Sequence, residues 1–276
     1  MPECEVTMSR RAVFSAGHRY WRDDLSPEQN REVFGKWASP YNHGHNYVLW
    51  VKAQGQVDPV TGMVVNIKRI DDVLQERVVR VLDQRSLNDE VEAFRHTAPS
   101  LENLLAYLRS ILTELPDRAK LVGLRLDETE SLRAEWNAPG NMLTITRTYE
   151  FAAAHRLHTD ALSDAENLDL YGKCHNPAGH GHNYVLEVSV SGSADPVSGM
   201  LCRLEDLDEA VQTEVLDRYD HRNLDMEIEE LHGRPTTSEN VAAAIFDRLK
   251  DKVPAKLSKV VLYETARNAF EVNADE

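Results

Sequence analysis

The sequence is poor in cysteine, in long apolar runs and in basic charge, and each shortage excludes a class of protein. Its three cysteines, Cys4, Cys174 and Cys202, lack disulfide-like spacing, which indicates a reducing compartment and leaves Cys174 available for chemistry. No apolar run approaches the roughly 18 residues that span a bilayer. Residues 1–11 are polar and lack the apolar core of a signal peptide, so we expect a cytoplasmic protein.

The charge balance limits the partners. Acidic residues outnumber basic residues by 46 to 31, which gives a formal net charge of −15. A surface of this sign repels nucleic acid and anionic membranes, so we expect neither as a partner. A polyanionic substrate would need a local basic pocket.

One stretch carries most of the chemistry: residues 172–184, which read G-K-C-H-N-P-A-G-H-G-H-N-Y. Side chains alternate along an extended chain, so His180 and His182 point to the same face. His155 ends a second strand-like run, residues 142–155. A lone histidine on an apolar strand is usually a core residue. Three of them beside a cysteine indicate a catalytic zinc site, in which three imidazoles leave one metal position open.

The chain repeats these motifs at a distance of 137 residues. This separation relates the three histidines to His18, His43 and His45, and it also relates further pairs: Gly62 and Gly199, Asp83 and Asp220, Leu87 and Leu224, Asn103 and Asn240. A period of this length indicates duplication of a whole small domain. We therefore divide the chain into residues 1–138 and 139–276, which join at the turn-rich residues 137–141.

The two copies differ where chemistry beyond zinc would reside. Cys174 corresponds to Trp37, and His221 corresponds to Gln84. The dipeptide Asp220-His221 alone would be read as a surface turn. Its histidine is lost together with the cysteine, however, as expected if the acid orients an imidazole that activates a thiol. The second half has three histidines without a counterpart, which we expect in loops or at the surface: His158, His175 and His232.

The periodicity predicts an α+β fold in each half. Two strands joined by a long loop come first, then a Gly-Met turn, an amphipathic helix, a second helix and a closing strand. The strands are expected at residues 6–18, 45–53 and 121–129, and at 142–155, 182–191 and 258–265; the second helix of the second half begins near residue 238. We expect an antiparallel four-stranded sheet with two helices per half, and assembly through the open sheet edges.

Two pairs of glutamates are candidates for ligand binding. Glu264 and its copy Glu128 lie on apolar strand faces, where a carboxylate is costly unless it is paired. A salt bridge is the usual reason, and the other is an anchor for paired N–H donors such as those of a pterin ring. Glu239 reads as part of a capping box with Thr236. Its copy Glu102 is kept where the threonine becomes Pro99, which favours a ligand contact.

Together these motifs resemble the 6-pyruvoyltetrahydropterin synthase family. The second half carries F-A-A-A-H-R-L, the stretch 172–184, G-M, D-H-R-N-L, T-S-E-N and Y-E-T in order; the first half is similar through F-S-A-G-H-R, H-G-H-N-Y, L-E-N and D-E-T. The resemblance implies two tandem tunnelling-fold (T-fold) units that assemble into β-barrel rings. It also implies a carbon–oxygen lyase that converts 7,8-dihydroneopterin triphosphate into 6-pyruvoyltetrahydropterin and triphosphate.

The resemblance assigns roles to individual residues. One Zn²⁺ would bind to His155, His180 and His182, and a second to His18, His43 and His45 of the degenerate first half. Cys174 would be the general base, with Asp220, His221 and Glu264 in its proton relay. Pterin would bind to Glu239 and Glu264, and to their copies Glu102 and Glu128 if the first half binds it at all.

In the family, the cysteine and the Asp-His pair of one site come from neighbouring units. A ring of three units cannot alternate first and second halves, so we expect like halves in each ring, with three chains forming a pseudo-hexamer. Three alternatives stay open. One is 6-carboxytetrahydropterin synthase of the deazapurine pathway, against which the longer spacing from Cys174 to His180 argues. The others are a non-catalytic pterin or zinc binder, and a zinc hydrolase that needs no thiol.

Overall fold

The computed structural model describes residues 5–274 and divides into two compact units. The first comprises Met1–Ile145 with Ser191–Arg203, and the second comprises Thr146–Val190 with Leu204–Glu276. The short segment Ser191–Arg203 of the second repeat thus packs with the first repeat. Cys174 and Cys202 are free thiols, and Cys4 lies outside the described residues.

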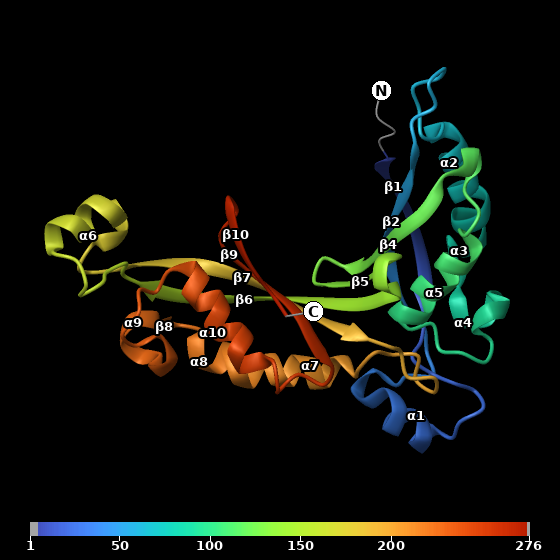
Figure 1. Cartoon of the computed structure of the whole chain (residues 1–276). Coiled ribbons are helices and arrows are strands. Elements are labelled where there is room, and N and C mark those ends of the chain that lie inside the picture. The colour runs from blue at the N-terminus through green and yellow to red at the C-terminus, as the bar shows by residue number, and fades with distance from the viewer. Residues whose placement is uncertain (1–4, 275–276) are drawn as a thin grey trace. The chain divides into compact units, whose positions relative to one another are not determined.

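The first unit is built on an antiparallel sheet (Figure 1). Its strands follow the order β3-β1-β2-β4-β5. Their bounds are β1 Glu5–His18, β2 His43–Gln56, β3 Arg85–Ser86, β4 Lys120–Thr129 and β5 Leu132–Asn137. The short β3 runs parallel to β1. The register pairs His18 with His43, so the ends of β1 and β2 bring these histidines together.

The second unit repeats this plan in the order β8, β6, β7, β9, β10. Its strands are β6 Met142–His155, β7 His180–Gly192, β8 Arg222–Asn223, β9 Lys256–Thr265 and β10 Asn268–Asn273. Buried side chains alternate along β7 from Tyr184 to Val188, as expected of a half-buried strand, and the end of the strand is buried on both faces.

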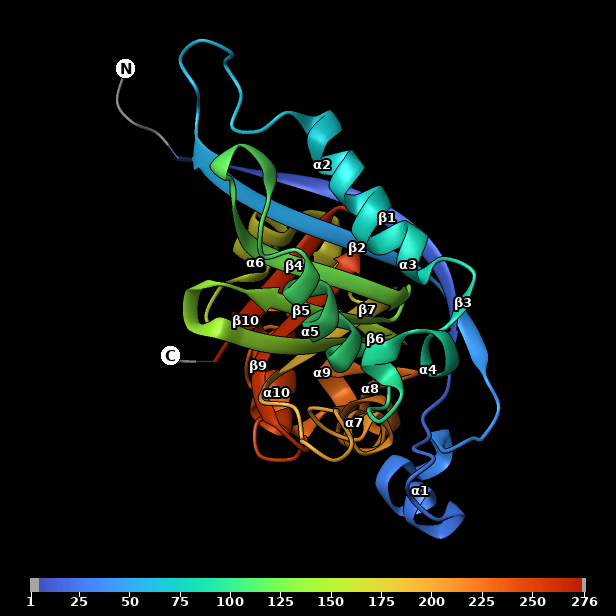
Figure 2. The ribbon, with the colours of Figure 1, turned by 90° about the vertical axis from the view of Figure 1, so that its right-hand side faces the viewer.

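Helices cover one face of each sheet. Figure 2 shows α2, α3 and α5 on the sheet of the first unit. The main helices are α2 Ile67–Leu74, α3 Arg80–Leu82 and α5 Leu101–Ile111 in the first unit, and α7 Leu204–Val211, α8 Asp217–Tyr219 and α10 Ser238–Leu249 in the second. A π-helical turn joins the first two helices of each set, η2 Gln75–Val79 and η7 Gln212–Leu216. Single helical turns complete the units: α4 Leu87–Glu90, α9 Leu224–Glu227, η1 Gly35–Trp37, η3 Glu92–Phe94, η4 Pro116–Arg118, η5 Pro139–Asn141, η6 Gly172–His175 and η8 Glu229–Leu231.

The long loops predicted between the first two strands of each half each contain a helix, so that prediction was wrong. These helices are α1 Pro27–Phe34 and α6 Asp164–Tyr171. Ser26 and Ser163 each form a capping box with the residue at the third helical position. A buried asparagine, Asn30 or Asn167, then bonds the carbonyls of the loop. The capping pattern was readable in the sequence.

The α+β class and the two-repeat architecture are confirmed. Each unit has four antiparallel strands and, in addition, one two-residue parallel strand. Closure of the sheets into barrel rings stays a prediction. Within residues 5–274, every helix is too short or too polar to cross a bilayer.

A strained turn joins the end of α3 in the first unit, and of α8 in the second, to the sheet. After α3, Gln84 adopts a positive φ of 57°, and its N–H donates to the carbonyl of Ser15 at 2.6 Å. The side chain of Asp83 accepts from the N–H of Ser15 at 2.7 Å. In the second unit, His221 (φ 58°) and Asp220 bond Ala152 in the same way. The aspartate is therefore kept in both halves for a structural reason.

We predict that Gln84→Gly stabilises the protein. Glycine adopts positive φ without the steric cost that other residues incur, so the free energy of unfolding should rise by about 0.5–1 kcal/mol. Chemical denaturation measures this change. Ser86→Gly is the matched control, because Ser86 has an ordinary φ of −82° and glycine there should destabilise. A loss of stability in Gln84→Gly would contradict the strain argument.

Candidate metal centre and active site

Three histidines of the second unit meet at one end of its sheet. His155 ends β6, and His180 and His182 begin β7. One ligand-type nitrogen of each lies within 4.8 Å of the others. Gly181 between them is required by close approach, because a Cβ there would lie 3.2 Å from the carbonyl oxygen of Ala153. The alternation read from the sequence thus gives the predicted cluster.

The first unit holds the same cluster. His18 ends β1, His43 and His45 begin β2, and their nitrogens also lie within 4.8 Å of one another. Gly44 has the role of Gly181, with a Cβ position 3.2 Å from the carbonyl oxygen of Ala16. The structure therefore brings together all six histidines expected to bind metal, as two sets of three.

The surroundings of these histidines suit a metal ion. The Nδ1 atom of His18 bonds the carbonyl of Pro99 at 2.9 Å, and that of His155 bonds the carbonyl of Thr236 at 2.7 Å. These bonds turn Nε2 of each ring inward, where it is buried without a hydrogen-bond partner. Such outer bonds orient histidine ligands in metal sites. Three neutral nitrogens around one point fit Zn²⁺ with an open position.

Burial keeps most of these imidazoles neutral. It lowers the pKa of His18 to about 3 and that of His45 to about 4. It also lowers the pKa of His43, His180 and His182 below the ordinary value. A neutral imidazole offers the lone pair that a metal ion needs, so the rings are prepared for binding at neutral pH.

A glutamate stands beside each cluster. Glu264 Oε1 lies 3.8 Å from Nε2 of His155 and 3.9 Å from Nε2 of His182. Although burial opposes it, hydrogen bonds from Asn268 and Ser238 hold the pKa of Glu264 below its ordinary value. The carboxylate is therefore held in its charged form beside the histidine cluster. The copy Glu128 lies 3.9 Å from His18 and 3.7 Å from His45.

The other predicted catalytic residues lie on separate elements. Cys174 is half-buried in the turn η6. His221 is exposed, and its Nδ1 lies 2.9 Å from Oδ2 of Asp220. The hydrogen bond from Ala152 N–H holds the pKa of Asp220 below its ordinary value. In residues 5–274, no hydrogen bond or ion pair joins Cys174 to this pair. One chain therefore supplies both parts of the relay without connecting them.

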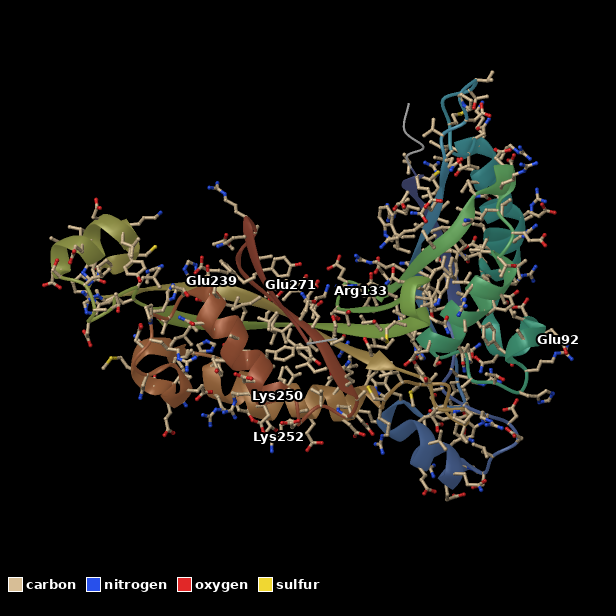
Figure 3. The ribbon with its side chains drawn as sticks, in the orientation of Figure 1. Glu92, Arg133, Glu239, Lys250, Lys252 and Glu271 are labelled. Carbon is tan, nitrogen blue, oxygen red and sulfur yellow. The ribbon has the colours of Figure 1, made fainter. Side chains whose placement is uncertain are left out.

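The two remaining glutamates occupy different surroundings. Glu239 is exposed in the first turn of α10, as Figure 3 shows. The helix is capped at Thr237 without a side-chain bond, so the capping box expected with Thr236 does not form. Glu102 is buried, and it accepts a hydrogen bond from the N–H of Leu201 at 2.7 Å. One oxygen of the carboxylate that was expected to bind pterin is thus already bonded to the chain's own backbone.

A third cluster escaped the sequence analysis. His158, Asp164 and His175 could also surround an ion, and His175 is buried although a loop or surface position was expected. However, the guanidinium of Arg156 lies 3.1 Å from Nε2 of His175, and the carbonyl of Leu157 lies 3.1 Å from Nδ1. Both ring nitrogens are used and a cation is adjacent, so this cluster is unsuited to a metal. No regular spacing of these three residues in the sequence pointed to this cluster.

Comparison with known proteins agrees with this geometry. The family described as 6-pyruvoyl tetrahydropterin synthase matches the chain twice, over residues 7–139 and 144–275. The chain belongs to this family, as a tandem duplication.

Relatives match one repeat's length each. The 6-pyruvoyl tetrahydrobiopterin synthase of Drosophila melanogaster is 46% identical over 126 residues, which is 45% of this chain and 75% of that protein. The human enzyme of the same name is 45% identical over 125 residues, 45% of this chain and 86% of that protein. A solved structure of the Caenorhabditis elegans 6-pyruvoyl tetrahydropterin synthase, 45% identical, covers 49% of this chain and 96% of that chain with a TM-score of 0.47.

We predict about two equivalents of zinc per chain, one in each synthase-like half. His180→Ala and His43→Ala should each remove one equivalent and spare the other, because the clusters share no residue. Metal analysis of the purified variants by mass spectrometry measures this. His232→Ala, a histidine outside both clusters, is the control. Zinc content that stays constant in His43→Ala would show that the first half holds none.

Glu102 gives a pH-dependent prediction. Burial raises the pKa of this carboxyl from the ordinary 4.5 to about 7, against the hydrogen bond from Leu201. The folded state then binds more protons than the unfolded state between these values, so stability is present at low pH and is lost as pH rises through 7. In Glu102→Gln, the fall in the free energy of unfolding with rising pH should be smaller by up to about 3 kcal/mol. Denaturation at pH 5 and pH 8 measures it. Glu239→Gln, at the exposed copy, should leave the wild-type dependence.

Proposed function

We propose that this chain converts 7,8-dihydroneopterin triphosphate into 6-pyruvoyltetrahydropterin with release of triphosphate, and that only the second half does so. The relatives named as 6-pyruvoyl tetrahydrobiopterin synthases support the reaction. One observation supports the restriction of this reaction to the second half. That half has the histidine cluster, Cys174 and the Asp220-His221 pair, whereas the first half keeps the cluster and Asp83 but has neither the thiol nor the second imidazole.

The substrate would bind beside the histidine cluster and the adjacent Glu264 of the second half. Zinc held by His155, His180 and His182 would supply Lewis acidity toward the hydroxyls of the substrate side chain. Glu264 would accept the paired N–H donors of the pterin ring, because its carboxylate is charged, fixed by Ser238 and Asn268, and adjacent to the metal position.

The proton at the side-chain carbon would be taken by the thiolate of Cys174. His221, oriented by Asp220, would keep that thiol deprotonated and carry the proton onward. These two parts are not joined within one chain, so we infer that the cysteine of one chain works with the Asp-His pair of a neighbour. The exposure of His221 is consistent with a partner on that side.

Trp37 occupies the position of Cys174 in the first half, and Gln84 that of His221. Neither can act as a base at neutral pH. The zinc cluster and Glu128 of that half would then serve structure and not turnover.

We predict that Cys174→Ala lowers turnover by about 10²–10⁴-fold, as expected for loss of a general base. His221→Gln, which recreates the first-half residue, should lower it similarly and should leave zinc content unchanged. Trp37→Ala is the matched control at the copied position and should keep the wild-type rate per folded protein. Mass spectrometry of the products formed from 7,8-dihydroneopterin triphosphate measures these effects.

The same assay separates the alternatives. Formation of a carboxy pterin with acetaldehyde would instead place the chain with 6-carboxytetrahydropterin synthases, of which the Haemophilus influenzae protein is 30% identical over 144 residues. Full activity in Cys174→Ala would favour a zinc hydrolase without a thiol base. If the zinc-loaded wild type showed no turnover, the non-catalytic pterin or zinc binder would be the alternative that remains.

A further inference from the structure

The segment Asp195–Leu201, here called the docking turn, packs on the start of helix α5 within the first compact unit. Leu201 N–H donates to Glu102 at 2.7 Å, and Ser100 Oγ donates to the carbonyl of Gly199 at 2.7 Å. Met200 is 4% exposed and joins an apolar cluster with Tyr20, Phe34 and Ala98. The segment thus fills a surface formed by the first half.

Gly199 shows how tight this contact is. A Cβ on Gly199 would fall on the side-chain amide of Asn103, and its φ is +73°. That amide is fixed in turn by a bond of 2.8 Å to the carbonyl of Ala98. Only glycine fits between the turn and the helix start.

The repeat supplies a second docking turn, Asp58–Val64, which is fully formed. Asp58 Oδ1 accepts from the N–H groups of Val60 and Thr61 at 3.0 and 2.7 Å, as Asp195 does from Val197 and Ser198 at 2.9 and 2.7 Å. The φ of Gly62 is +70°, against +73° for Gly199. A turn already in its bound shape loses little entropy on binding.

This second turn has no partner surface in the described part of the chain. Met63 is 42% exposed, whereas its copy Met200 is 4% exposed. Val60 is among the most exposed apolar side chains described, and Gly62 is exposed where Gly199 is buried. The exposed Met63 is thus the copy of Met200, the methionine that anchors the other docking turn.

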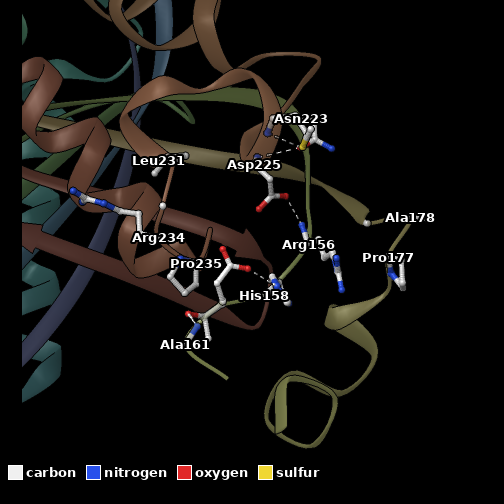
Figure 4. A pocket seen from close by; sticks show the side chains of 15 residues that line it. Arg156, His158, Ala161, Pro177, Ala178, Asn223, Asp225, Leu231, Arg234 and Pro235 are labelled. Atoms are coloured by element: carbon white, nitrogen blue, oxygen red, sulfur yellow. Dashed lines mark hydrogen bonds and ion pairs between the residues drawn. The ribbon is translucent and has the colours of Figure 1, made fainter. Parts of the chain in front are cut away.

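The repeat likewise supplies a second receiving surface, at the start of α10. Asn240 bonds the carbonyl of Pro235 at 2.8 Å, as Asn103 bonds Ala98. The positions that correspond to Tyr20, Phe34, Ala98, Ser100 and Glu102 are Leu157, Tyr171, Pro235, Thr237 and Glu239. All five are buried in the first half, and none is buried in the second. Pro235 also lines an open pocket of about 590 Å³ beside this surface (Figure 4).

We propose that the docking turn Asp58–Val64 of one chain binds the receiving surface around Pro235, Thr237 and Glu239 of a second copy of this chain. Met63 enters between Leu157, Tyr171 and Pro235. Val64 N–H donates to the carboxylate of Glu239, and Thr237 Oγ1 donates to the carbonyl of Gly62. This assigns Glu239 to the contact between chains, in place of the pterin role that the family resemblance implies.

The occupant is a second copy because every contact has its precedent within the chain. The first half cannot receive the free turn, since its receiving surface already holds residues 195–201. Unlike halves therefore meet at this contact, in contrast to the rings of like halves expected from the sequence. The Asp-His pair proposed to work with Cys174 would then reach it through a different contact of the assembled chains, because the first half has Gln84 in place of the histidine. A turn on one half and a receiving surface on the other make a head-to-tail interface, which continues until the rotation closes a ring. One contact is not repeated: Arg22, which bonds the carbonyl of Val197, corresponds to Thr159.

The test uses one variant on each side of the contact. Met63→Asp places a charge on the turn, and Pro235→Asp places one on the receiving surface. Neither residue belongs to the proposed catalytic set. By sedimentation velocity the wild type should exceed the mass of one chain, and each variant should fall to a single chain. An equimolar mixture should give a species of two chains, because the intact turn of Pro235→Asp meets the intact surface of Met63→Asp.

Complementation distinguishes this interface from a symmetric one and from misfolding. The proposal would be overturned if either variant kept the wild-type mass. It would also be overturned if the mixture stayed monomeric while both variants retained native circular dichroism and zinc. Met200→Asp is the matched control on the docked copy. It should lower the thermal midpoint by several degrees below that of monomeric Met63→Asp, because it buries a charge within a single chain. Activity is not the readout, so failure of the proposed reaction would leave the result intact.

Discussion

The structure depends on one hydrogen bond that occurs in each half, from a strand-end histidine to a carbonyl just before a helix. His18 bonds Pro99, and His155 bonds Thr236. The bond joins the sheet to the last long helix and fixes which ring nitrogen faces the cluster. Because the carbonyl lies directly before the helix that carries Glu102 or Glu239, the same few residues position a metal ligand and the surface where a turn docks.

The sequence was sufficient for the elements that follow simple periodicity. The alternation around His180 and His182 predicted their common face, and the 137-residue repeat located the second cluster without any relative. It was insufficient where a residue's partner is distant. Asp220 was predicted to orient His221, and no sequence pattern showed that it also accepts from the backbone N–H of Ala152, as Asp83 does from Ser15. Glu102 looked like a ligand anchor, yet it bonds a backbone N–H that is 99 residues away. Contacts of this kind depend on tertiary placement, which no local pattern encodes.

If the proposals hold, duplication separates turnover from assembly, two tasks that one unit would otherwise combine. The first half keeps its histidines and its strained turn but has tryptophan and glutamine where the second half has a thiol and an imidazole. Its helix start is filled by the second half's own segment, which leaves one turn and one receiving surface for other chains. The half proposed to lack turnover is then also the half whose turn is proposed to bind another chain.

The π-helical turns Gln75–Val79 and Gln212–Leu216 make the geometry sensitive to helix phase. Each such turn takes up one residue more than an α-helical turn would, and one residue corresponds to roughly 100° of rotation. Without it, the helix end would present another side chain to the strand, and Asp220 and His221 would face away from Ala152. The orientation of an exposed imidazole thus depends on one additional residue within the π-helical turn that precedes it.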